Sequence, residues 1–188
     1  MGMVAVTSRK WSVEEFHALP ESPGQLVELL DGELLMTPAP RRTHQRAVAV
    51  LFEALLPFVR TLGAEVLSTP EEVSPDPWTA VQPDLVVLPF VAGRLARDDE
   101  QPVPLLIVEV LSPSTARFDR GRKRALYQRL GVTYWIVDLD AQLVEQWMPE
   151  AVSPVVCHEE LRWHPESATE PFRLDLPAFF ARVIPGGA

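Results

Sequence analysis

The stretch LLIVEVLS, residues 105–112, constrains the fold more than any other part of this 188-residue chain. A short run of aliphatic, β-branched residues is typical of a strand buried on both faces of a sheet. Glu109 interrupts that run. An ionised carboxylate inside such a strand costs free energy unless a cation pairs with it. The sequence therefore predicts that Glu109 either points out at a strand end or faces a cationic partner.

The rest of the chain alternates between strand and helix patterns. The predicted elements are a capped helix at 12–20, a hairpin at 25–37, a long helix at 41–62, a strand near 64–68, a short aliphatic strand within 80–89 that has Asp84 at its start, a strand near 105–110, a helix from 115 or 119 to 130, a hairpin at 132–149, a weak strand at 154–158 and an apolar segment at 176–184. Pro57 should bend the long helix or end it early. These patterns indicate a single α/β domain over residues 1–188, with a core at about 41–148. We expect a mixed β-sheet flanked by helices, with extra N-terminal and C-terminal hairpins.

Composition and charge exclude several classes of protein. The net charge of −9 argues against a dedicated nucleic-acid coat protein, although positive charge could still gather at one site. Cys157 is the only cysteine, so a disulfide framework is excluded. The chain has neither an apolar run of about 20 residues nor the apolar core of a signal peptide near its start. We expect a cytoplasmic protein without membrane contact.

Two carboxylates stand out on successive aliphatic strands. Asp84 follows Pro83 at the head of LVVL, and Glu109 lies within LIVEV. If these strands are neighbours, both side chains can reach one point, where they and a backbone carbonyl, assigned to Val110, would bind Mg²⁺ or Mn²⁺. The alternative is that Asp84 caps a turn and that Glu109 faces solvent at an edge.

The helix after Glu109 offers a cation. At about 100° per residue, Lys123 lies in the middle of the apolar stripe that should face the sheet. Asp119 and Tyr127 lie one turn on either side and could orient its ammonium. The alternative is a lysine whose stem follows the core while its charge reaches water.

These residues resemble the PD-(D/E)XK nuclease superfamily, which has a Pro-Asp, a Glu in a hydrophobic strand and a nearby Lys. The superfamily Lys normally stands two residues after the Glu, but position 111 here is Leu. The run PDLVVL, LIVEVLSPST, Asp119, Lys123, Tyr127 and GVTYWIVD, with the early ELLDGEL and a His in the long helix, resembles the Uma-type family of bacterial restriction-endonuclease-like proteins. In that family the Lys is thought to have moved to the following helix, which matches Lys123.

The resemblance implies a restriction-endonuclease-like core in which Asp84 and Glu109 hold a metal and Lys123 takes the catalytic Lys role. It also implies that His44 and Glu33 could be a third metal or water contact. The alternative interpretations are that His44 is a satisfied histidine at the start of a helix and that Glu33 is a hairpin glutamate facing solvent. Gln82, just before Pro83, could also line the site.

The expected function is a Mg²⁺-dependent DNA endonuclease. Arg117, Arg120 and Arg124 belong to the one local basic cluster and could contact DNA, although an ordinary solvated helix face explains them too. One active site cuts one strand, so double-strand cleavage would call for a homodimer. The alternative is a non-catalytic nucleic-acid-binding or assembly protein on a nuclease scaffold, which the acidic net charge favours.

Overall fold

The computed structural model describes residues 4–5, 9–20, 22–97, 99–184 and 186. Its central feature is a six-stranded sheet with the strand order β11-β10-β9-β8-β7-β4. The strands are β4 (Ala64–Ser68), β7 (Leu85–Pro89), β8 (Leu106–Val110), β9 (Thr133–Asp138), β10 (Leu143–Trp147) and β11 (Val155–Cys157). Strands β8 and β9 are parallel and the other pairs are antiparallel, so the sheet is mixed, as predicted.

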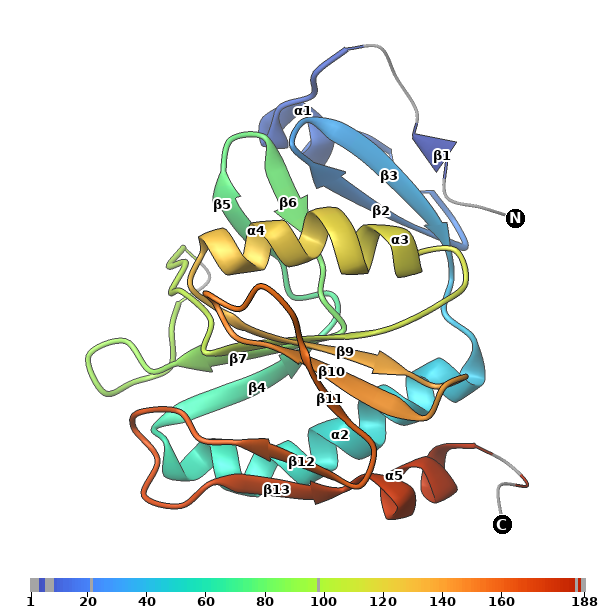
Figure 1. The fold of residues 1–188 in the computed structure, drawn as a ribbon. Coiled ribbons are helices and arrows are strands. Elements are labelled where there is room, and N and C mark those ends of the chain that lie inside the picture. The colour runs from blue at the N-terminus through green and yellow to red at the C-terminus, as the bar shows by residue number, and fades with distance from the viewer. Residues whose placement is uncertain (1–3, 6–8, 21, 98, 185, 187–188) are drawn as a thin grey trace.

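Helices cover both faces of this sheet (Figure 1). One face packs against α2 (Arg42–Thr61), α5 (Leu176–Val183) and the hairpin of β12 (Glu160–Trp163) and β13 (Phe172–Asp175). The other face packs against a continuous helical segment made of α3 (Ala116–Phe118), the π-helical turn η1 (Asp119–Lys123) and α4 (Arg124–Arg129). Side chains alternate along β8, so that Val108 faces α2 while Ile107 faces α4.

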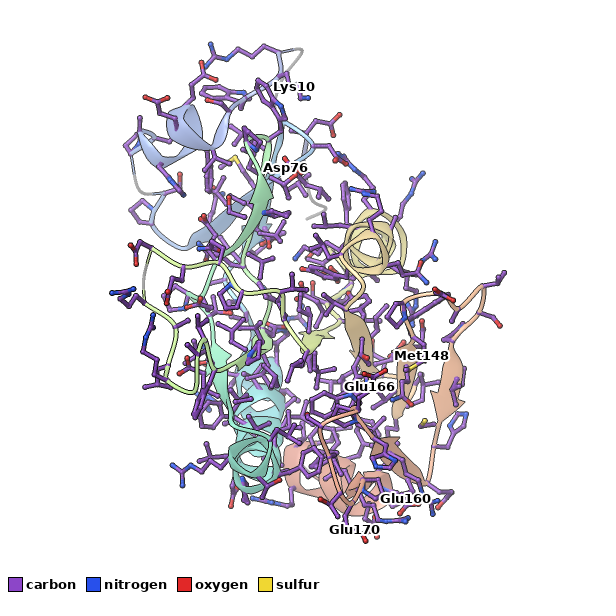
Figure 2. The ribbon with its side chains drawn as sticks, turned by 90° about the vertical axis from the view of Figure 1, so that its left-hand side faces the viewer. Lys10, Asp76, Met148, Glu160, Glu166 and Glu170 are labelled. Carbon is purple, nitrogen blue, oxygen red and sulfur yellow. The ribbon has the colours of Figure 1, made fainter. Side chains whose placement is uncertain are left out.

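A second, smaller sheet lies beyond α3–α4 (Figure 1). It has the order β1-β3-β2-β6-β5 and comprises β1 (Val4–Ala5), β2 (Gln25–Leu30), β3 (Glu33–Pro38), β5 (Val73–Asp76) and β6 (Thr79–Val81), beside helix α1 (Val13–His17). In Figure 2, Lys10 and Asp76 mark this end of the molecule, and Glu160 and Glu170 mark the opposite end. The turn Asp31–Gly32 between β2 and β3 has positive φ angles of 53° and 86°, as expected for an Asp-Gly hairpin.

The short aliphatic strand predicted within residues 80–89, with Asp84 at its start, is β7, which begins at Leu85 in the central sheet. Residues 80–81 belong instead to β6, which ends at Val81 in the small sheet. Pro83 has no backbone N–H to continue a ladder, so the chain changes sheets there. Asp84 thus lies at the crossing between the two sheets.

Of the two effects expected of Pro57, an early end of the long helix does not occur, since α2 runs to Thr61. Pro57 is exposed on the outer side of α2, where the carbonyl freed by its missing N–H can reach water. The tail contains the hairpin β12–β13, which agrees with the expected C-terminal hairpin, although no strands had been assigned to residues 160–163 and 172–175.

Among the described residues, no helix is long and apolar enough to cross a membrane. Part of the N-terminal segment considered for a signal peptide, residues 1–3 and 6–8, lies outside the described residues.

Candidate active site

Glu109 faces a buried cation, which is the second of the two alternatives that the sequence left open. The Lys123 Nζ donates a hydrogen bond of 2.8 Å to Glu109 Oε1. The Tyr127 hydroxyl donates to the same oxygen at 3.4 Å. Glu109 is 5% exposed and Lys123 is 4% exposed, so this ion pair lies between β8 and the α3–α4 segment. Lys123 therefore does not carry its charge to the surface.

Lys123 is the last residue of a π-helical turn. In η1 the N–H of Arg124 bonds to the carbonyl of Asp119, five residues earlier. The widened turn leaves both Asp119 and Lys123 buried, with 4.0 Å between Asp119 Oδ1 and Lys123 Nζ. Single π-helical turns are frequent at functional sites.

Glu28 is a second partner of Lys123, and the sequence analysis missed it. Glu28 Oε1 lies 2.8 Å from Lys123 Nζ, and it also accepts a hydrogen bond of 2.8 Å from the backbone N–H of Gln82. Glu28 thus links Lys123 to the residues that precede Asp84. The signal was present in the sequence, since Glu28 interrupts the apolar strand LVELL just as Glu109 interrupts LIVEV.

Asp84 reaches the same region from the neighbouring strand. Leu85 pairs with Val108 in the antiparallel ladder of β7 and β8. Continuing that register by one residue places Asp84 opposite Glu109, and directly opposite residues share a face of the sheet. The backbone N–H of Val110 donates to Asp84 Oδ2 at 2.8 Å and holds the carboxylate in place.

His44 is the other neighbour of Asp84. Its Nε2 lies 3.1 Å from Asp84 Oδ2, and its Nδ1 is buried without a hydrogen-bond partner among the described residues. Burial of the ring opposes its positive charge. Hydrogen bonds to Asp84 and to the backbone of Val110, with the Asp84 charge, outweigh that effect and raise the pKa of His44 above its ordinary value.

A profile of a protein family described as "Putative restriction endonuclease", Uma2, matches residues 13–177 of this sequence. The chain belongs to the Uma2 family. The resemblance drawn from the sequence motifs is therefore confirmed. Among curated proteins, none matches the chain.

A solved structure supports the fold of this Uma2 chain. A crystal structure of a protein from Anabaena variabilis, described as "a putative nuclease", superposes with a TM-score of 0.74 at 20% sequence identity. The match covers 92% of this chain and 99% of the other one. The expected fold class, a mixed sheet flanked by helices, is confirmed.

Negative charge exceeds positive charge around Lys123. Burial, with the nearby charges of Asp84, Asp119 and Glu28, raises the pKa of Glu109 well above its ordinary value although Lys123 opposes this. Burial raises the pKa of Asp119 to about 6, again against the effect of Lys123. A second cation beside these carboxylates would lower both values, because an opposite charge favours the ionised form.

The raised pKa of Asp119 should make the free energy of unfolding depend on pH. Folded Asp119 keeps its proton up to a pH of about 6 and unfolded Asp119 loses it near 3.8, so between these values the folded state binds more protons and its stability falls as pH rises. Asn cannot titrate. We expect the free energy of unfolding of Asp119→Asn, relative to wild type, to increase by about 2–3 kcal/mol between pH 4 and pH 6.5. Urea unfolding at a series of pH values measures this difference, and a constant difference would contradict the raised pKa.

The side chains at this position fit Mg²⁺ or Mn²⁺ only as part of its coordination shell, with waters and substrate phosphates as the other ligands. Among the described residues, no group of three or more His, Cys, Asp and Glu side chains could hold a metal ion. Mg²⁺, however, is commonly bound through one or two carboxylates together with waters and substrate phosphates. Asp84 and Glu109 supply two such carboxylates, and both contacts that Lys123 and Tyr127 make with Glu109 use Oε1. Glu109 Oε2, an oxygen of Asp84 and the Val110 carbonyl would be the protein ligands.

Other predicted site residues lie elsewhere or are used differently. Glu33 is exposed, and its Oε2 accepts a hydrogen bond of 2.5 Å from Arg122 Nη1. This ion pair links the β2–β3 hairpin to η1, so Glu33 serves the packing of these elements and not the carboxylate pair of Asp84 and Glu109. Gln82 reaches the site through its backbone N–H, which donates to Glu28.

The predicted DNA-contacting arginines are mostly engaged within the chain. Arg120 forms ion pairs of 2.8 Å with Asp138 and 2.6 Å with Glu145. Arg124 bonds to Gln128 and stacks over the Trp147 ring at 4.7 Å. Arg117 is exposed and has no ion pair among the described residues. A basic DNA-binding face on this helix therefore stays a prediction, and it depends chiefly on Arg117.

Proposed function

We propose that this chain is a metal-dependent endonuclease that hydrolyses phosphodiester bonds in DNA. The observation that carries the proposal is the buried pairing of Lys123 with Glu109 and Glu28, on the face of the sheet that Asp84 also reaches. Membership of the Uma2 family supports the same reaction class. A buried ion pair is by itself weak evidence that it stabilises the fold. Its presence here therefore favours a functional role for Lys123 and its partners.

The chain's own residues have separable roles in this proposal. Asp84 and Glu109 would hold Mg²⁺ or Mn²⁺, with the Val110 N–H and His44 fixing one oxygen of Asp84. A bound ion would lower the pKa of the attacking water and stabilise charge on the phosphate. Lys123 is too deeply buried to meet a substrate directly in this structure, so it acts as a positioning residue that holds Glu109 and offsets its charge. Tyr127 supports the same oxygen of Glu109.

Cleavage of both strands of a duplex would need two copies of this site. We propose a homodimer for that reaction, since each chain supplies one pair of carboxylates. A single-strand nick needs only one copy.

Plasmid nicking tests the proposal. Supercoiled plasmid is incubated with wild type or Glu109→Gln in Mg²⁺, in Mn²⁺ or in EDTA. Wild type should nick the plasmid only with metal, and Glu109→Gln should be slower by about a thousandfold, as for the loss of one transition-state contact. Glu145→Gln is the matched control, because Glu145 is a buried carboxylate of the same sheet that pairs with Arg120 instead.

Two outcomes would contradict the proposal. Equal nicking by wild type and Glu109→Gln would mean that another protein cuts the plasmid. Binding without nicking by wild type, in either metal, would favour the non-catalytic nucleic-acid-binding protein.

A further inference from the structure

We propose that a groove beside Asp84 binds the base of an unpaired nucleotide, so that the substrate is DNA with a single-stranded or unpaired segment. This inference rests on the proposed function, because a base in the groove would bring its own phosphate to Asp84. It goes further by naming the form of nucleic acid that the site accepts.

The groove is continuous with the candidate active site. It is a cavity of about 490 Å³ between the outer face of α2 and the chain that follows β4, and Asp84 and His44 line it. Ligand pockets commonly span about 300–1,000 Å³, so a nucleotide fits within the range. His44, Val48 and Phe52 follow one another at intervals of four residues on α2 and therefore share a face. A ligand along that face would end at the carboxylate of Asp84.

The walls of the groove suit a nucleobase. Val48, Ala49 and Phe52 form an apolar side, and Phe52 offers an aromatic ring on which a base can stack. Ser68 and Thr69 supply hydroxyl groups on the other side. The Thr69 hydroxyl donates to the Pro83 carbonyl at 3.0 Å, so it can still accept a hydrogen bond from a base edge.

Gln45 of α2 adds a further polar group to the groove. Its amide can both donate hydrogen bonds to a base and accept them from it. An aromatic ring combined with amide and hydroxyl groups is the usual means by which proteins bind splayed-out bases. A base inside a duplex is stacked and paired, and it could enter this groove only after leaving the helix.

The distribution of charge favours an unpaired strand over a long duplex. Duplex binding gains most of its affinity from basic side chains that neutralise successive phosphates. This chain has a net charge of −9, and Arg120 and Arg122 are engaged in ion pairs with its own carboxylates. Arg41 and Arg42 are exposed at the start of α2, close in sequence to His44, and have no ion pair among the described residues. They could contact the phosphates that flank one nucleotide.

Fluorescence anisotropy in EDTA, which prevents cleavage by a metal-dependent enzyme, tests the inference. Three labelled probes of equal length are compared: a single strand of mixed sequence, a strand in which abasic sites replace the central bases, and a blunt duplex. We expect wild type to bind the single strand about tenfold more tightly than either other probe, within the range that one or two stacked bases provide.

Two variants then test the groove itself. Ala49→Trp should fill it and weaken binding of the single strand about tenfold, with no effect on the abasic strand. Ala49 is exposed on α2, so the larger side chain need not disturb the core, and circular dichroism checks the fold. Phe52→Leu keeps an apolar contact but removes the ring, and should weaken the same complex severalfold. Ala178→Trp is the matched control on α5, at an exposed position that does not line the groove, and should bind like wild type.

The inference is overturned if the abasic strand or the duplex binds as tightly as the single strand, if Ala49→Trp changes nothing, or if no probe binds. Parallel nicking assays separate this failure from that of the proposed function. Nicking of plasmid by wild type and Ala49→Trp at equal rates would overturn the groove while the nuclease stands. Groove-dependent binding of the single strand without any nicking would support the groove while the nuclease falls.

Discussion

Replacing Lys123 by Met should lower the free energy of unfolding by about 3–5 kcal/mol, the usual cost of removing one partner from a buried ion pair. Lys123 bonds to both Glu28 and Glu109 at 2.8 Å, and all three side chains are buried. Met has a similar length but no charge, so two carboxylates would remain without a cation. They must then either stay ionised at high cost or take up protons. Urea unfolding at pH 7.5 measures the change.

Lys10→Met is the matched control, because Lys10 is the only other lysine in the chain. Lys10 is exposed and lies over the Trp78 ring at 4.3 Å, so its replacement should cost less than about 1 kcal/mol. Adding Glu28→Gln to Lys123→Met should recover part of the lost stability, since one unpaired carboxylate is removed. If Lys123→Met costs no more than Lys10→Met, the buried ion pair does not have the energetic role inferred from its geometry.

Replacing Asp84 by Asn should reduce metal-dependent nicking by about a thousandfold, because it removes one of the two carboxylates proposed to hold the ion. The fold should change little. Asn retains an oxygen that can accept the Val110 N–H, which bonds to Asp84 Oδ2 at 2.8 Å in wild type. The change in the free energy of unfolding should therefore stay below about 1 kcal/mol. Initial rates of nicking and urea unfolding measure the two effects separately.

A second measurement on Asp84→Asn examines the electrostatics without any metal. Asp84 raises the pKa of His44 against the effect of burial. In Asp84→Asn that contribution is lost, and an NMR titration should show a lower pKa for the His44 ring. Asp76→Asn serves as the control for both measurements, because Asp76 lies in β5 of the small sheet and accepts its hydrogen bond from the Trp78 N–H. Nicking by Asp84→Asn at the wild-type rate would remove Asp84 from the proposed site.

Local patterns in the sequence were sufficient for most of the elements. The Asp-Gly turn, the capping box of Ser12 and Glu15 and the apolar stripe of α2 each predict structure that the fold contains. They succeed because a turn, a cap or a helix face depends on residues a few positions apart. The crossing at Pro83 was harder to predict. The stretch AVQPDLVVLP does not reveal by itself that Ala80 and Leu85 belong to different sheets.

The candidate site also combines residues that the sequence could identify with contacts that only the structure shows. Asp84, Glu109 and Lys123 could be selected from the sequence, because a charged residue within an apolar pattern is costly unless it has a partner. The inward direction of Lys123 followed from helical periodicity. The structure alone identified Glu28 as its second partner, and alone showed that Arg120 bonds to Asp138 and Glu145.

The sequence by itself determined which charges must be buried, since that depends on the apolar residues beside each one. Only the tertiary structure decided which charges meet. Glu28 and Lys123 are 95 positions apart in the printed sequence, and they come within 2.8 Å because the hairpin β2–β3 packs across the α3–α4 segment. No periodicity along the chain encodes such a contact, because it depends on how whole elements pack and not on their internal geometry.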